Sequence, residues 1–240
     1  MKIRKLFLFG DSFAAGINKD INGNYNSREN QQEINFGTQL RKYIDIESIE
    51  NLGTAGRANG AISKDIFLTH KQINSAKDFA IVTWSGMFRN FGTDLESERF
   101  VPKPFTEEPE FMKEIAKNFA YISNAIVQLR SHKIDFICTN SFVNYSTIQE
   151  YKLALFPFVD EWVEWGKPGN TLYDMANGTF LEDTTDYNDV ASHGNTLRIK
   201  NSDNINVCFH PNKNGHDIIA KKLSEYILDG FYKKGTFHYA

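Results

Sequence analysis

Short, mainly apolar runs alternate with helical patterns along this chain, and the alternation limits the folds that it can adopt. Runs of this kind are typical of strands buried on both faces of a sheet. The predicted strands are residues 6–9, 46–49, 79–84 and 134–139, and the second of these is the weakest. Helical spacing of apolar residues predicts helices at residues 36–44, 61–70, 111–130 and 217–231. This order implies right-handed crossovers and a parallel sheet covered by helices on both faces.

The first predicted strand stops at Gly10, and Asp11 and Ser12 follow at once. Ligands bind at the carboxyl edge of open α/β sheets, so we expect the Ser12 hydroxyl to lie at a binding edge. Ser12 is therefore a candidate nucleophile. The alternative is an ordinary turn with a capping serine, because Gly, Asp and Ser are common turn residues.

Two further loops are expected at the same edge. A glycine-rich stretch, Asn51-Leu-Gly-Thr-Ala-Gly-Arg-Ala-Asn-Gly60, follows the second predicted strand. Backbone N–H groups in such a loop can bind a developing negative charge; Gly56 is the natural donor, and Gly53 permits the turn. A glycine-rich loop without a ligand is the alternative. After the third strand, Ser85 and Asn90 are polar candidates for the site.

A histidine near the end of the chain can complete a catalytic pair. The stretch Ile205-Asn-Val-Cys-Phe-His-Pro-Asn-Lys-Asn-Gly-His216 leads into the last predicted helix. Pro211 keeps the backbone of His210 extended, which can aim its imidazole across the sheet edge. His210 is then placed to take the Ser12 proton as a general base and to return it as a general acid. We expect His216 to pack or cap in the first turn of the helix.

Composition narrows the class of protein. With 41% hydrophobic residues in 240, the chain can bury the core of one domain. Its formal charge of -3 argues against a nucleic-acid partner. Two cysteines make no disulfide framework, and the apolar run after Lys5 is too short for a signal peptide. No run is long enough to span a membrane. The sequence therefore predicts a soluble, cytoplasmic protein without a Walker-type phosphate loop.

Two segments stand apart from the alternation. Residues 145–200 are too long for a plain crossover, and we expect them to form a cap or insertion whose aromatic residues pack into the core. Pro157 interrupts their helical spacing and should kink or restart the helix. Residues 18–29 have part of the spacing of a calcium loop, but Asn18 stands where Asp is usual, so a solvated loop is favoured.

Three motifs in this order together resemble the SGNH/GDSL hydrolases: Gly10-Asp11-Ser12, Asn51-Leu-Gly-Thr-Ala-Gly56 and His210-Pro-Asn-Lys-Asn-Gly-His216. The resemblance implies a flavodoxin-like three-layer α/β/α sandwich with a parallel sheet of about five strands, and residues 145–200 inserted before the last. It also implies hydrolysis of small-molecule, lipid or carbohydrate esters through an acyl-Ser12 intermediate, without a cofactor or metal. His210 is the implied base, and the N–H groups of Ser12 and Gly56 form the implied oxyanion hole.

The chain departs from the family pattern at two positions. The family places an Asn after the third strand, where this chain has Trp84-Ser-Gly-Met-Phe88; Ser85, the N–H of Gly86 or Asn90 are the candidate replacements. The positions of the triad acid fall on Val207 or Cys208, and Asp203 is the nearest upstream carboxylate.

A Ser–His dyad, oriented by a backbone carbonyl or by Asp203, remains chemically possible because the third group mainly orients the histidine. The alternative function is that of a catalytically weak or inactive relative that binds a glycan or a protein partner through the same cleft. The oligomeric state is unknown from the sequence.

Overall fold

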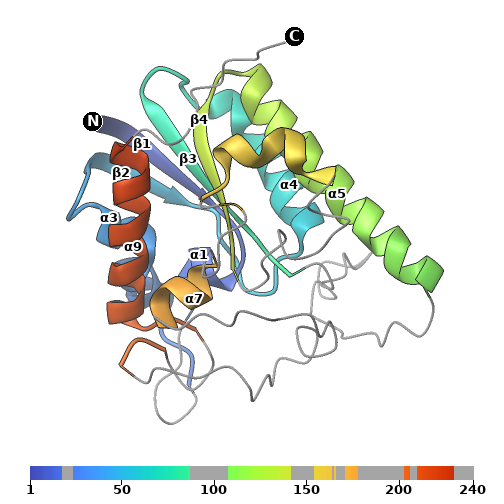
Figure 1. The fold of residues 1–240 in the computed structure, drawn as a ribbon. Helices are drawn as coiled ribbons and strands as arrows, with labels where there is room; N and C mark the ends of the chain where they lie inside the picture. Colours follow the sequence, from blue (N-terminus) through green and yellow to red (C-terminus); the bar gives the residue numbers. More distant parts are fainter. Residues whose placement is uncertain are drawn as a thin grey trace.

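A parallel sheet of four strands forms the centre of the protein in a computed structural model (Figure 1). The strands run in the order β2-β1-β3-β4. They are β1 (Lys2–Phe9), β2 (Asp45–Asn51), β3 (Asp78–Trp84) and β4 (Asp135–Asn140). This is the order of the first four strands of a flavodoxin-like sheet. The structure describes residues 1–17, 24–86, 108–141, 154–163, 165, 171–177, 203–205 and 210–229.

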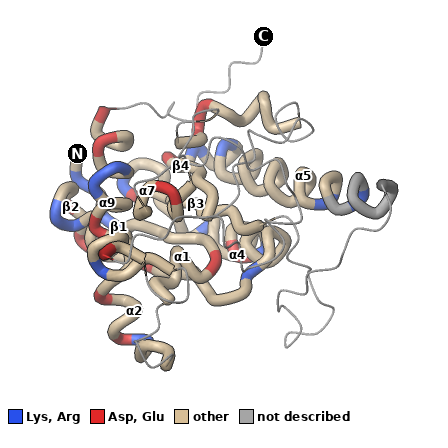
Figure 2. Tube along the Cα trace, turned by 60° about the horizontal axis from the view of Figure 1, so that its bottom comes forward, with Lys and Arg blue, Asp and Glu red and all other residues tan. Residues whose placement is uncertain are grey.

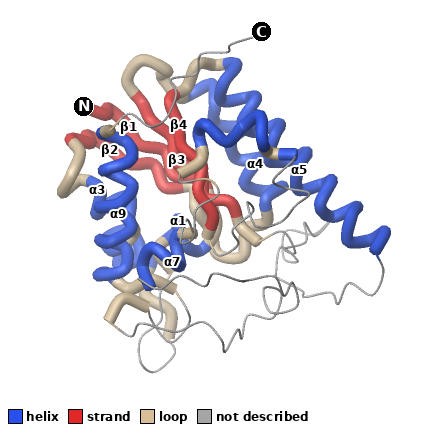
Figure 3. The backbone as a smooth tube through the Cα atoms, in the orientation of Figure 1, coloured by secondary structure: helices blue, strands red, loops and turns tan. Residues whose placement is uncertain are grey.

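Helices cover both faces of the sheet, as the alternation predicts (Figure 3). One face carries α4 (Asn59–Thr69) and α5 (Glu108–Ser131), and the other carries α3 (Phe36–Leu40) and α9 (Lys213–Leu228). Two short helices, α1 (Ser12–Ala15) and α7 (Leu172–Asn177), lie at the carboxyl end of the strands, and α2 (Arg28–Ile34) precedes α3. The predicted three-layer α/β/α arrangement is confirmed.

The pleat of the strands explains why their sequences are apolar throughout. Alternate side chains point to opposite faces, and here both faces are core. Phe7, Phe9 and Val82 belong to the core beneath α4 and α5. Leu8 and Ile81, which are paired across β1 and β3, belong to the core beneath α3 and α9. All of these side chains are at most 1% exposed.

The described sheet has four strands, where the resemblance implies about five. Beyond β4, single residues pair with it: Cys138 bridges to Trp162, and Asn140 bridges to Thr171, both in the parallel sense. Ile205 instead bridges antiparallel to Pro211, so the chain turns back there. Residues 206–209, directly before His210, lie outside the described residues. The outer edge of β4 is thus covered by isolated bridges from the expected insertion rather than by a described fifth strand.

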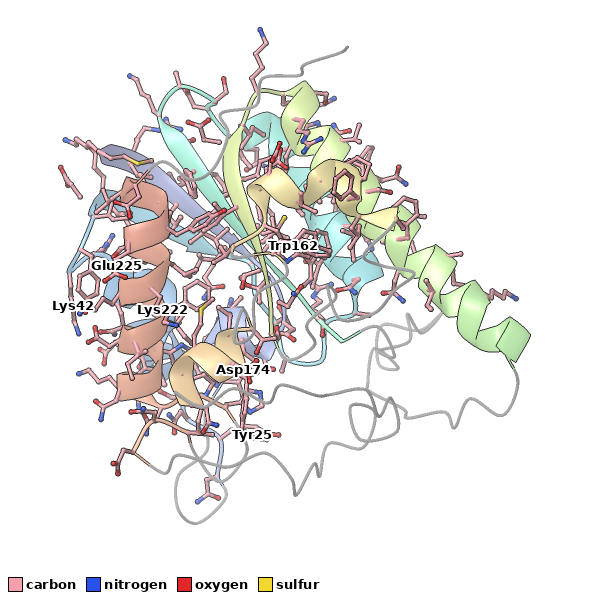
Figure 4. All side chains as sticks on the ribbon, in the orientation of Figure 1. Tyr25, Lys42, Trp162, Asp174, Lys222 and Glu225 are labelled. Atoms are coloured by element: carbon pink, nitrogen blue, oxygen red, sulfur yellow. The ribbon has the colours of Figure 1, made fainter. Side chains whose placement is uncertain are left out.

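The described part of residues 145–200 packs against the sheet and α5. Pro157 lies in the first turn of a 3₁₀ helix, η3 (Phe156–Glu161), so it begins a helix and does not kink one. Arg130 on α5 donates to both carboxylate oxygens of Glu161, which is 3% exposed. Trp162 is buried beside β4 and α5 (Figure 4), where its ring meets that of Trp165 edge-on. For Phe158, Trp162 and Trp165 the prediction of core packing is thus confirmed, while Tyr151 lies outside the described residues.

Some of the remaining predictions concern residues that the structure does not describe. Residues 18–23 of the calcium-like spacing lie outside the described residues, and Glu29 lies in the first turn of α2. Cys208 is also outside them, while Cys138 is a buried free thiol in β4. Within the described residues, no helix is long and apolar enough to cross a membrane.

Candidate active site

The turn after β1 places Ser12 at the carboxyl edge of the sheet. Gly10 passes so close to β3 that a Cβ there would lie 2.8 Å from the Cβ of Thr83. Asp11 caps α1: its Oδ1 accepts a hydrogen bond from the N–H of Phe13 at 3.0 Å. Ser12 is the first residue of α1 and is 4% exposed. The local sequence therefore both ends the strand and starts the helix that presents the serine.

His210 meets Ser12 across 198 residues of sequence. The Nε2 of His210 lies 2.7 Å from the Oγ of Ser12, which is a hydrogen bond of ordinary length. The ring of Phe13 lies against the imidazole, with 5.3 Å between ring centroids and 37° between the planes. The structure thus brings together the predicted nucleophile and the predicted base in the geometry that general-base activation needs.

The residues after His210 hold it in place. The Asn212 Oδ1 caps α9 by accepting the N–H of Gly215 at 3.1 Å. The Nδ2 of Asn212 donates to the backbone carbonyl of Asp203 at 2.8 Å. A Cβ on Gly215 would lie 2.3 Å from the carbonyl oxygen of Asn204, so only glycine permits this approach. The His-Pro-Asn-Lys-Asn-Gly motif therefore fixes the start of α9 beneath the imidazole.

Asp203, the candidate for the triad acid, is exposed. The hydrogen bonds described for it use its backbone carbonyl, which accepts from the amides of Asn212 and Asn214. These two bonds anchor the loop before α9. Val207 and Cys208 lie outside the described residues.

The glycine-rich loop after β2 is tied to α1. The Nδ2 of Asn51 donates to the carbonyl of Ala14 at 2.7 Å, and its Oδ1 accepts from the N–H of Gly53 at 2.9 Å. A Cβ on Gly53 would lie 2.6 Å from the backbone nitrogen of Ala15, so this turn requires glycine. Gly56 has φ +77°, a left-handed conformation that glycine adopts without strain. The loop that carries Gly56 is therefore held beside the helix that carries Ser12.

Ser85 and Gly86 follow β3 at the same edge, and Asn90 lies outside the described residues. The Oγ of Ser85 donates to the Oδ2 of Asp11 at 2.9 Å. The Oγ of Ser141, directly after β4, donates to the Oδ1 of the same carboxylate at 2.7 Å. Ser85 thus contacts the residue before the nucleophile and joins the ends of β1 and β3.

Sequence reasoning missed three polar residues of this edge. Asn59 at the start of α4 holds Ser85 through the backbone, Asn118 on α5 accepts from Asn59, and Ser141 binds Asp11. Asn118 lies on the apolar face of its helix between Ile115 and Ile122. A polar residue at such a buried position is the sequence signal that could have identified it. Ser141 comes two residues after the predicted strand 134–139, as a polar residue close to a strand end like Ser12 and Ser85.

Among the described elements, Figure 2 shows α1 with an acidic segment beside it, and basic and acidic residues are interspersed over the surrounding elements. The described residues hold no group of three or more His, Cys, Asp or Glu side chains that could bind a metal ion.

Three solved structures that this chain resembles in fold are esterases. Est24, a carbohydrate acetylesterase from Sinorhizobium meliloti, matches with a TM-score of 0.53 and 10% identity over 94% of this chain and 99% of its own. An aryl esterase from M. smegmatis matches with a TM-score of 0.51 and 10% identity over 94% and 99%. The psychrotrophic esterase EstA from Pseudoalteromonas sp. gives 0.50 and 12% over 94% and 97%. The chain has the fold of these esterases.

The fold that the resemblance to the SGNH hydrolases implies is thus confirmed. No protein-family model matches the sequence, and no curated protein matches it. At 10–12% identity the matches establish architecture, and the arrangement of Ser12 and His210 comes from this chain's own contacts.

His216, the second histidine of the motif, packs in the first turns of α9 as expected. Its imidazole is 0% exposed, and neither ring nitrogen has a hydrogen-bond partner among the described residues. The ring of Phe36 lies 6.3 Å away between centroids. Burial lowers the pKa of His216 from 6.5 to about 3, and the nearby charge of His210 adds to this effect. His216 therefore stays neutral in the folded protein and serves packing.

This burial makes an expected pH dependence of stability. Between about pH 3 and 6.5 the unfolded chain binds a proton at His216 that the folded protein excludes, so stability falls as the pH falls. From pH 7 to pH 5 we expect His216 to cost about 2 kcal/mol of unfolding free energy. A His216→Phe variant should lose that much less than the natural protein on urea unfolding at the two pH values. Equal pH dependence of both proteins would contradict a neutral, buried His216.

Proposed function

We propose that this protein is a serine-dependent ester hydrolase that works through an acyl-Ser12 intermediate. The observation that carries the proposal is the 2.7 Å contact between the Oγ of Ser12 and the Nε2 of His210 at the carboxyl edge of the sheet. A buried serine hydroxyl has no need of an imidazole at this distance for packing, whereas a nucleophile needs an adjacent base. The fold shared with esterases supports the same conclusion.

In the proposed acylation step, Nε2 of His210 takes the proton of Ser12 while Oγ attacks the carbonyl carbon of the ester. The tetrahedral intermediate collapses, the bond from carbon to the leaving oxygen breaks, and His210 gives its proton to the departing alcohol. In deacylation a water molecule gives a proton to His210 and attacks the acyl carbon. The carboxylic acid leaves, and the proton returns to Ser12.

The oxyanion that forms in each step needs hydrogen-bond donors. We assign this role to the N–H groups of Ser12 and Gly56, which the motifs imply, with Gly86 in place of the family's Asn. The hydroxyl of Ser85 is directed to Asp11 instead. We further propose that Ser12 and His210 are the reacting pair, with His210 oriented by a backbone carbonyl or by Asp203, because the third group of a triad mainly fixes the tautomer and direction of the histidine.

The proposed substrates are esters of small molecules or carbohydrates. The matched esterases from S. meliloti and M. smegmatis are described as acting on carbohydrate acetates and as an aryl esterase, respectively. An aryl acetate is therefore a suitable first substrate, since its phenolate leaves without help from a specific pocket.

The test of this proposal is turnover of 4-nitrophenyl acetate by the purified protein, with acid quenching during the first seconds. We expect steady release of nitrophenolate and, in the quenched sample, a protein whose mass has risen by one acetyl group. An unmodified protein without turnover, combined with saturable binding of an acetylated sugar, would instead identify an inactive relative that uses the same cleft for binding.

A further inference from the structure

Asp11 lies at the centre of a buried polar network that the proposed chemistry does not itself use. Its carboxylate accepts hydrogen bonds from the N–H of Phe13, the hydroxyl of Ser85 and the hydroxyl of Ser141, at 3.0, 2.9 and 2.7 Å. Asp11 and Ser141 are 0% exposed, and Ser85 is 1% exposed. One carboxylate therefore connects the ends of β1, β3 and β4 with the first turn of α1.

A second layer of the network holds Ser85 itself. The Oδ1 of Asn59 accepts the N–H of Ser85 at 2.8 Å, and its Nδ2 donates to the carbonyl of Ser85 at 3.2 Å. The same Nδ2 donates to the Oδ1 of Asn118 at 2.9 Å. Both hydrogens of the Asn59 amide are thus engaged. The N–H of Gly86 belongs to the peptide whose carbonyl Asn59 binds, and in a trans peptide it points the opposite way.

Burying these polar groups has an energetic cost that apolar residues of similar size would avoid. Fully satisfied buried networks can instead fix one arrangement of the chain. The arrangement fixed here is that of residues 10–13, because Asp11 both caps α1 and precedes the nucleophile. A displacement of about 1 Å of a catalytic group can cost about a hundredfold in rate.

We infer that Asp11 is the positioning residue that keeps Ser12 within hydrogen-bond distance of His210. Its carboxylate is itself held by the hydrogen bonds from the hydroxyls of Ser85 and Ser141. Asn59 supports this arrangement through its two hydrogen bonds with the backbone of Ser85. The same bonds set the direction of the Gly86 N–H. Ser85 thus acts through Asp11. It stands near the position of the family's Asn but has a different function. This inference rests on the proposed hydrolase activity of Ser12.

The carboxylate's geometry and its charge can be separated by substitution. In Asp11→Asn, the remaining oxygen can still accept from Phe13 and Ser141, and the new NH₂ can donate to Ser85, whose hydroxyl both donates and accepts. Asp11→Ala removes every one of these bonds. A positioning role therefore predicts that asparagine largely rescues what alanine loses.

The experiment compares 4-nitrophenyl acetate kinetics and thermal midpoints of these variants. We expect Asp11→Ala to lower kcat by about a hundredfold with little change in KM, and Asp11→Asn to stay within about tenfold of the natural protein. Ser85→Ala and Ser141→Ala should each lower kcat by about tenfold. The matched control is Ser224→Ala on α9, a serine of similar burial at 3% exposure whose hydroxyl donates to Lys221, which should leave kcat unchanged.

Two results would overturn the inference while leaving the hydrolase proposal intact. One is that Ser85→Ala and Ser141→Ala lower the thermal midpoint but keep full kcat, as the Ser224 control does, which would make the network purely structural. The other is that Asp11→Asn is as impaired as Asp11→Ala, which would assign the effect to charge. Absence of turnover in the natural protein would overturn both proposals together.

Discussion

Ser12→Ala is expected to lower kcat for an aryl acetate by at least about a thousandfold, which is the largest effect in the protein. The alanine keeps the buried backbone of α1 but has no oxygen to form the acyl intermediate. What remains is binding and the backbone N–H groups, which accelerate attack by water only weakly. The fold should be unaffected, since the hydrogen bond described for the Ser12 hydroxyl is the one with His210.

Ser123→Ala is the matched control for this variant. Ser123 lies on α5, and its hydroxyl donates to the carbonyl of Ala120 in the same helix at 3.3 Å. We expect full activity from it. A Ser12→Ala protein that keeps more than about a tenth of the natural kcat would show that another group is the nucleophile.

His210→Ala is expected to have an effect of similar size, because Ser12 without a base is a weak nucleophile at neutral pH. The two residues act as a unit, so their losses should not add. We expect the double variant Ser12→Ala/His210→Ala to be about as slow as either single variant. Steady-state kinetics of the three proteins at one pH is the measurement. Strictly multiplicative losses would contradict a coupled pair.

Much of the fold was predictable because strands that are buried on both faces are short runs of mainly apolar residues. Residues 79–84 are mainly apolar in sequence, and each of them is 0% exposed in β3. The strand count was wrong in the resemblance-based expectation. The edge of β4 is covered through bridges to Trp162 and Thr171, and single-residue pairing leaves no periodic pattern in a sequence.

The candidate site, like the fold, was predictable only in part. Ser12 and His210 were predictable from local signals. Ser12 follows a strand end with Gly-Asp, and His210 directly precedes a proline that keeps its backbone extended. The partners of Asp11 were not. Ser141 and Asn59 meet the network only through the register of β4 against β3 and the packing of α4 on α5, which no local pattern encodes.

The central claim is that Ser12 is a nucleophile activated by His210, and covalent labelling with an ethyl phosphonate probe tests it most directly. The matched Pseudoalteromonas esterase was solved in a form inhibited by monoethylphosphonate, which supports this choice of reagent. After proteolysis and mass spectrometry, we predict one adduct, on the peptide that contains Ser12, absent from Ser12→Ala and formed far more slowly in His210→Ala. No adduct on the natural protein, an adduct on another residue, or an unchanged labelling rate in His210→Ala would contradict the account.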